Sequence, residues 1–185
     1  MDEQVNLKQE YKKNIKREIL EWITTILVAV VIAMIIKTFI FTIALVDGSS
    51  MLPTLTHGDR VIVWRLGYKP QKGDIIVLQQ EGKNPYIKRI IATEGDTVDI
   101  DYSAHTVSVN GVALEEDYIL EPTALRGDVM FPLTIREDCV FVLGDNRNNS
   151  SDSRVSSVGQ VAEEDIMGKA TIRLFPFNKF GSVYK

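Results

Sequence analysis

The sequence is short of the residues that disulfides and metal sites require. Its 185 residues include one cysteine, Cys139, and two histidines, His57 and His105. A single cysteine excludes an internal disulfide, and this set offers too few soft ligands for a structural zinc site. Cys139 lies in an apolar run and is predicted to be a small core residue, and the histidines are predicted to lie in loops. No metal or other cofactor is implied.

An excess of basic residues is also missing. The formal net charge is -4, and both signs are spread along the chain. Nucleic acid requires a positive stripe or patch, so no nucleic-acid partner is expected. Once the apolar N-terminal segment is set aside, roughly 140 residues remain, which is the size of one domain with a hydrophobic core.

Long apolar runs are confined to one region. Residues 22–36 are all uncharged, and after Lys37 residues 38–46 are uncharged again. Fifteen residues are fewer than the ~20 that a straight span needs, but the flanking side chains of Glu21 and Lys37 can extend to the two membrane interfaces. We therefore predict a transmembrane anchor at residues 19–40. The basic residues that precede it place residues 1–18 in the cytoplasm and residues 41–185 outside, as a single-pass protein of the cell membrane in contact with lipid. A cleavable signal peptide is the alternative, but residues 43–47 lack a small-x-small cleavage pattern.

Beyond the anchor, short β-type runs alternate with turn signals. This pattern predicts a mainly β domain, with an Asn-Gly hairpin turn at residues 110–111 and a first turn at 102–105. The weak periodicity of residues 113–128 predicts an irregular insertion, and acidic residues predict a short helix at 162–167. The expected strands are 60–65, 74–79, 86–92, 97–101, 106–109, 129–135, 139–143 and 169–174.

Three polar stretches are candidates for chemistry. Residues 47–55 place two serines after a glycine, which on local grounds is more often a turn. The period of two in residues 86–91 puts Lys88 and Arg89 on opposite faces, so one of them stands among apolar neighbours; the alternative is an edge strand with its cation at the surface. Residues 143–154 combine carboxylates, arginines and short polar side chains after an apolar strand, which favours a preorganised network over an exposed loop.

Taken in order, these stretches resemble a known family. Ser-Met-x-Pro-Thr-Leu from residue 50, Tyr-Ile-Lys-Arg from residue 86 and Gly-Asp-Asn-x-x-x-Ser-x-Asp-Ser-Arg from residue 144 resemble the motif boxes of type I signal peptidases. Residues 73–77 and 167–170 match further boxes. The resemblance implies a signal-peptidase-like catalytic β domain behind one N-terminal transmembrane helix. It also implies a serine endopeptidase that cuts signal peptides from exported preproteins after a small-x-small motif at the membrane surface.

The resemblance also implies roles for individual residues. Ser50 matches the nucleophile and Lys88 the general base, and register with the Met-x-Pro that follows favours Ser50 over Ser49. Ser150 matches the serine that orients the lysine. Three further residues match those that hold the site together: Asp145, Asp152 and Arg154.

The oxyanion hole and the substrate site follow in the same way. The Ser50 backbone amide is one expected donor. Many larger family members carry a hydroxyl residue two positions before the nucleophile, where this chain has Gly48, so the second donor is open and the Gly48 amide is a candidate. An extended peptide is expected to add as a strand beside the segments that lead to Ser50 and Lys88. The expected substrate-binding residues are Val46, Met51, Leu55, Tyr86 and Ile87.

A lysine can take a proton from serine only when it is neutral. The ordinary lysine pKa is about 10.4, so the site must lower it to about 7 to 8. Burial beside Tyr86 and Ile90 is expected to do so.

Two rival functions remain at this point. A self-cleaving repressor-type Ser/Lys protease has a related fold, but the anchor and the Tyr-Ile-Lys-Arg box favour the peptidase. A non-catalytic, membrane-tethered β module that binds exported chains is disfavoured by the presence of Ser50, Lys88 and Ser150. A histidine-dependent relative of the family is excluded by Lys88 at the box position.

Overall fold

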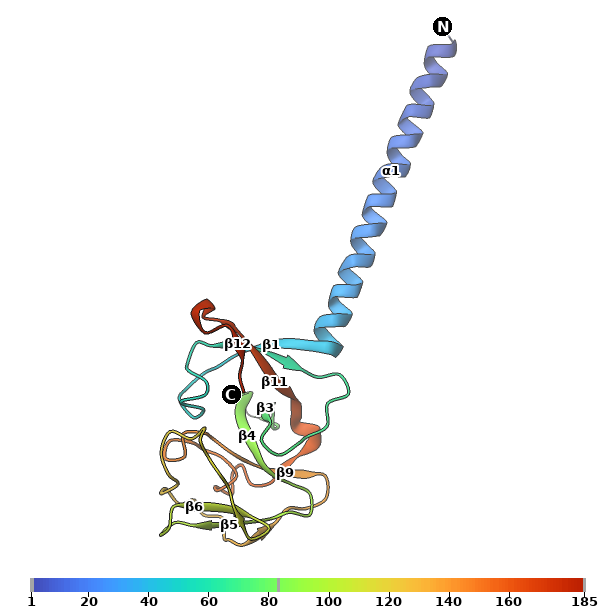
Figure 1. Ribbon diagram of the computed structural model, residues 1–185. Coiled ribbons are helices and arrows are strands. Elements are labelled where there is room, and N and C mark those ends of the chain that lie inside the picture. The colour runs from blue at the N-terminus through green and yellow to red at the C-terminus, as the bar shows by residue number, and fades with distance from the viewer. Residues whose placement is uncertain (1, 83, 185) are drawn as a thin grey trace. The chain divides into compact units, whose positions relative to one another are not determined.

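The chain folds as two compact units, residues 1–40 and 41–185. The computed structural model describes the backbone of residues 2–82 and 84–184, and the side chains from residue 15 onward within these ranges. In the first unit, α1 (Asp2–Ile35) continues into a short π-helix, η1 (Ile36–Ile40) (Figure 1). An 18-residue window within residues 15–40 has a mean hydropathy of 2.6. This helix is long enough and apolar enough to cross a membrane, as the sequence predicted.

The second unit is built on a large antiparallel sheet. Its eight strands follow the order β1-β2-β11-β3-β4-β9-β10, with β12 paired to β11. Since β1 pairs only with β2 among the described strands, its other edge is open. The strands are β1 (Phe41–Leu45), β2 (Arg60–Trp64), β3 (Ile75–Leu78), β4 (Tyr86–Thr93), β9 (Cys139–Leu143), β10 (Val161–Ala162), β11 (Ile166–Phe175) and β12 (Gly181–Ser182).

A smaller sheet contains the predicted hairpin. Its order is β7-β6-β5-β8, formed by β5 (Thr97–Asp101), β6 (Thr106–Val109), β7 (Val112–Ala113) and β8 (Leu133–Thr134). Val109 pairs with Val112 across Asn110 and Gly111, which both have positive φ, as a two-residue hairpin turn requires. The predicted Asn-Gly turn is therefore confirmed.

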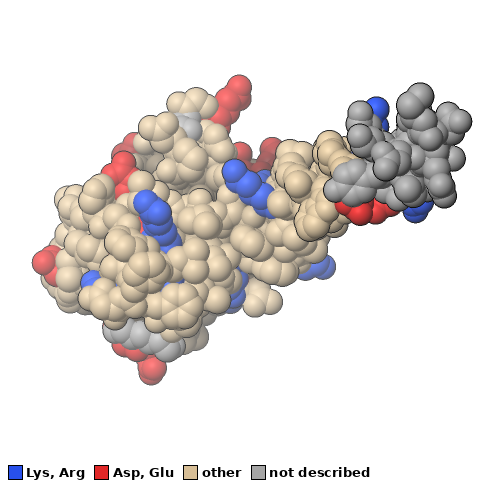
Figure 2. Space-filling model, turned by 90° about the horizontal axis from the view of Figure 1, so that it is seen from above, with Lys and Arg blue, Asp and Glu red and all other residues tan. Residues whose placement is uncertain are grey.

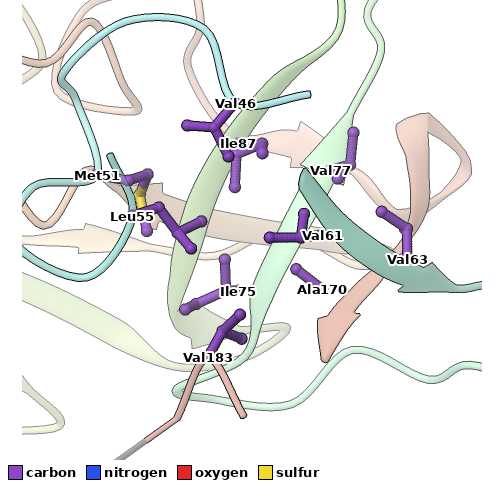
Figure 3. Close-up of a cluster of buried hydrophobic side chains, with 10 residues drawn as sticks. All are labelled: Val46, Met51, Leu55, Val61, Val63, Ile75, Val77, Ile87, Ala170 and Val183. Atoms are coloured by element: carbon purple, nitrogen blue, oxygen red, sulfur yellow. The ribbon is translucent and has the colours of Figure 1, made fainter. Parts of the chain in front are cut away.

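Strand β4 is the centre of the second unit. Its six inner residues are all buried, because hydrophobic clusters cover both faces of the strand. One cluster packs Ile87 against Val46 from the segment after β1 and Ile75 from β3 (Figure 3). On the other face, Ile90 packs among residues of β3, β9 and β10. Burial therefore takes in both cations of β4: Lys88 is 4% exposed and Arg89 is 5% exposed.

Two sequence expectations about secondary structure are wrong. Only Leu133–Thr134 of the expected strand 129–135 pairs in a sheet, because Pro132 has no N–H to donate and the Val129 N–H binds Arg154 O instead. The expected helix at 162–167 is a single 3-10 turn, η2 (Glu163–Asp165), because the chain joins β11 as soon as Ile166 pairs with Leu78. A second 3-10 turn, η3 (Phe177–Lys179), follows β11.

Candidate active site

Lys88 and Ser50 meet although 38 positions separate them in sequence. The Lys88 Nζ atom lies 2.8 Å from Ser50 Oγ and also donates to Ile87 O at 3.1 Å. The period of two in β4 places Lys88 on the same face as Tyr86 and Ile90, as expected, and its cross-strand partner is Ile76. An amine and a hydroxyl at this separation can exchange a proton directly.

Burial controls the charge of Lys88. Loss of solvation is the largest effect and lowers the pKa of Lys88 to about 8. The carboxylates of Asp152 and Asp145 act in the opposite direction, and Arg154 adds a smaller lowering effect. The balance leaves about one tenth of Lys88 neutral at pH 7, far more than an exposed lysine would supply.

Backbone hydrogen bonds to the turn before β2 hold the segment that carries Ser50. Val46 N–H donates to Asp59 O and Gly58 N–H donates to Val46 O, which extends the pairing of β1 and β2 beyond the strand itself. The Leu55 N–H donates to Met51 O in the turn after Ser50. Met51 and Leu55 point into the core beside Val46 (Figure 3). Ser50 is therefore held at the rim of the core.

The polar loop after β9 donates hydrogen bonds to the same segment. The Asn146 N–H donates to Ser50 O at 2.9 Å, and its side-chain amide donates to Ser49 O at 3.1 Å. The Asn149 side chain donates to Ser49 Oγ at 3.0 Å. Sequence reasoning treated Asn146 and Asn149 only as loop residues; their position in the matched Gly-Asp-Asn box was the one available signal.

Gly144 lets this loop approach Ser50. A Cβ atom at Gly144 would lie 2.5 Å from Ser50 O and 2.3 Å from Ser150 Oγ, so no side chain fits there. Ser150 thus lies close to the backbone of Ser50. Its hydroxyl is buried and has no hydrogen-bond partner among the described residues. The expected bond from Ser150 to Lys88 is not formed in this structure.

Buried ion pairs hold the loop in place. Asp145 accepts two hydrogen bonds from Arg89, at 2.8 and 2.7 Å, so the cation next to Lys88 is fixed on the opposite face of β4. Asp152 accepts from Arg154 at 2.8 and 2.9 Å and from the Gly144 N–H at 3.1 Å. Charge-assisted bonds of this geometry make the loop rigid. The structure places Asp145, Asp152 and Arg154 in the loop that contacts the Ser50 segment.

The irregular insertion contributes to this network, which the sequence did not predict. Arg147 is fully buried and pairs with Glu116, and its Nη1 atom also donates to Thr123 Oγ1 at 3.1 Å. The Arg89 guanidinium stacks on the Tyr118 ring, with its Cζ atom 4.0 Å from the ring centroid. The insertion therefore covers the ion pairs that position the loop.

The backbone amides of Gly48 and Ser50 differ in their partners. The Gly48 N–H donates to His57 Nδ1 at 3.2 Å, so the candidate second oxyanion donor is already occupied. The Ser50 N–H has no acceptor among the described residues. It is free to donate a hydrogen bond to an anion beside the Ser50 hydroxyl.

Two grooves flank the start of β4. A cleft of about 470 Å³ is lined by Ser50, Lys88, Tyr86 and Asn149 among others. A smaller groove of about 260 Å³ lies between β1 and β4, lined by residues 42–45, Pro85 and Ile87. Of the expected substrate-binding residues, Tyr86 and Ile87 line these grooves. The side chains of Val46, Met51 and Leu55 are buried in the core.

The chain was compared with known proteins. Residues 19–175 match the family described as signal peptidase, peptidase S26. Signal peptidase I of Bacillus licheniformis is 35% identical, over 92% of this chain and 96% of that protein. Signal peptidase IB of Staphylococcus aureus strain COL is 38% identical, over 90% of this chain and 94% of that protein. A crystal structure of a signal peptidase I from Enterococcus faecalis V583 has a TM-score of 0.46 and 32% identity, covering 55% of this chain and 97% of that chain. On the family match and the two relatives in sequence, the chain belongs to the signal peptidase family, peptidase S26.

Proposed function

We propose that this peptidase removes signal peptides from exported preproteins with Ser50 as nucleophile and Lys88 as general base. One observation carries the proposal: a serine hydroxyl lies 2.8 Å from a buried lysine whose pKa is lowered to about 8. A surface lysine in a binding module would have neither the contact nor the lowered pKa.

The geometry supports a two-step reaction. Neutral Lys88 takes the Ser50 proton as Oγ attacks the carbonyl carbon of the scissile bond. The Ser50 N–H donates a hydrogen bond to the carbonyl oxygen, which becomes negatively charged. The resulting Lys88 ammonium gives its proton to the leaving amine, which breaks the peptide bond and leaves an acyl-enzyme. Water, with its proton taken by Lys88, then attacks the acyl carbon, and Ser50 is released with its proton restored. The nearby carboxylates of Asp145 and Asp152 favour the ammonium that forms in each step.

Two open strand edges support substrate binding in an extended conformation. Among the described strands the outer edge of β1 is unpaired, and residues 86–88 of β4 lie beyond the pairing with β9, which begins at Arg89. The smaller groove lies between these edges. A peptide strand added there would direct alternate side chains to opposite faces, since Ile87 lines the apolar groove and Tyr86 lines the cleft. The groove volume of about 260 Å³ suits short side chains, as a small-x-small site supplies.

An apolar face supports work at a membrane surface. On the outer side of the large sheet, Ile43 pairs with Ile62, which pairs with Ile172. Phe177 and Phe180 after β11 are also exposed. Figure 2, which looks down on the β1 and β11 side of the second unit, shows a largely uncharged surface with scattered cations and with acidic side chains mainly at its margins. Such a patch on a peptidase fits contact with lipid. We place residues 1–18 in the cytoplasm, the membrane anchor at residues 19–40, and the catalytic domain, residues 41–185, on the extracytoplasmic side.

Cleavage of a preprotein tests this function. The full-length protein in detergent is incubated with a preprotein that carries alanine at positions −1 and −3, and mass spectrometry locates the cut. We expect one cut after the −1 alanine, and no cut when tryptophan replaces that alanine, because the groove is small. Cleavage at other bonds, or equal cleavage of both substrates, would contradict the proposal.

The pH dependence of kcat gives a second test. Lys88 acts as a base only when neutral, and its neutral fraction rises with pH through its pKa of about 8. We therefore expect kcat to increase about tenfold per pH unit well below that value and to level off above it. The measurement is kcat at saturating preprotein over a pH series. A plateau that begins below neutral pH would mean that another group is the base.

A further inference from the structure

His57 is close to Ser50 in sequence but lies outside the cleft. It follows the Ser50 turn by a few residues, its side chain is 71% exposed, and it does not line either groove. Its Nδ1 atom nevertheless accepts a hydrogen bond from the Gly48 N–H at 3.2 Å. The proposed mechanism gives this residue no role.

Gly48 needs an external restraint. It has φ of +93°, in the region that glycine adopts freely, and it stands two residues before Ser50. The segment before it is fixed through Val46, whose N–H and C=O both bind residues of the Gly58-Asp59 turn. Beyond Val46, the His57 ring gives the next bond from this turn to the backbone that leads into the nucleophile. We infer that His57 is a positioning residue for Ser50, a role that rests on the proposed function.

The same nitrogen has a second possible partner. Asp47 Oδ1 lies 3.2 Å from His57 Nδ1. A neutral Nδ1 without hydrogen accepts from the Gly48 N–H, whereas a protonated ring carries hydrogen on both nitrogens and can only donate, here to Asp47. One nitrogen cannot serve both partners at once. Protonation of His57 therefore removes the Gly48 bond and replaces it with an ion pair to Asp47.

Other charged groups nearby are already engaged. The Asp59 carboxylate, from the same turn as His57, accepts the Thr56 N–H at 3.0 Å and pairs with Arg173 of β11 at 2.9 Å. Asp47, from the segment after β1, is thus the carboxylate in contact with the ring. The exchange between Gly48 and Asp47 is set by the protonation of His57 itself.

Kinetics over a pH series test the role of His57. We expect His57→Ala to lower kcat by about 3- to 10-fold above the pKa of Lys88, with KM unchanged, because one positioning hydrogen bond is lost. The ratio of wild-type kcat to His57→Ala kcat is expected to fall to 1 at acidic pH, where the wild-type ring no longer accepts. His57→Asn keeps an acceptor near the position of Nδ1 and does not titrate, so it should retain the wild-type rate at high pH and exceed it at acidic pH.

Two further variants sharpen the test. Asp47→Asn removes the second partner of Nδ1 but leaves the ring that accepts from the Gly48 N–H, so it should retain the wild-type kcat at high pH. His105→Gln, at a ring that binds Thr123 O away from Ser50, should follow the wild-type curve. A ratio of wild type to His57→Ala that stays constant with pH, or that equals 1 throughout, would overturn the inference. Failure of the proposed dyad would appear instead as cleavage by Ser50→Ala, so the two failures are distinguishable.

Discussion

Ser50→Ala is expected to reduce kcat for preprotein cleavage by at least about 1,000-fold, because no other hydroxyl contacts the buried amine of Lys88 among the described residues. Ser49→Ala is the matched control. Among the described residues Ser49 Oγ binds Asn149 alone, so its loss should cost less than about 10-fold. Steady-state cleavage by both variants, with thermal unfolding to verify folding, makes the comparison.

Lys88→Met completes this prediction from the other side of the dyad. Methionine fills a similar apolar volume but takes no proton, so we expect kcat to fall by about 100- to 10,000-fold. The variant should also lose the rise of kcat through pH 8 that neutral Lys88 causes. Normal cleavage by Lys88→Met would contradict the dyad, and loss of cleavage by Ser49→Ala with activity in Ser50→Ala would reassign the nucleophile.

The contact between Ser50 and Lys88, on which the proposed dyad rests, was accessible from the sequence because its signals are local. The period of two in β4 required one of Lys88 and Arg89 to stand among apolar residues, and the motif boxes gave the register of Ser50. Burial on both faces of β4 was not predictable, because it depends on clusters assembled from distant strands. The hairpin at Asn110 was predicted for the same local reason, since its turn chemistry lies within two residues.

The supporting contacts were hidden because they are long-range. Asn146 meets Ser49 across 97 positions, and Tyr118 reaches Arg89 from an insertion without periodicity. His57 matched no motif, and only the folded turn brings its ring to the Gly48 amide. Sequence patterns report which face of an element is buried; they do not report which loop lies against it.

The ion pair between Asp145 and Arg89 leads to the largest expected effect on stability. Both side chains are almost fully buried, and Asp145 accepts two bonds from the guanidinium and one from Thr54 Oγ1. Asp145→Asn would leave the Arg89 charge buried without a counter-ion. Removing one partner of a buried pair costs about 3 to 5 kcal/mol of unfolding free energy.

Urea denaturation of the full-length protein in detergent measures this loss. Lys72→Gln is the control, since Lys72 pairs with Asp96 from a half-exposed position and should cost less than about 1 kcal/mol. Because Asp145 adjoins the Asn146 amide that holds Ser50 O, Asp145→Asn should also lower kcat at concentrations of urea where the protein remains folded. An unfolding free energy within about 1 kcal/mol of wild type would mean that Arg89 finds solvent or another partner. In that case Tyr118 and the insertion, rather than the ion pair, would hold the loop over the nucleophile.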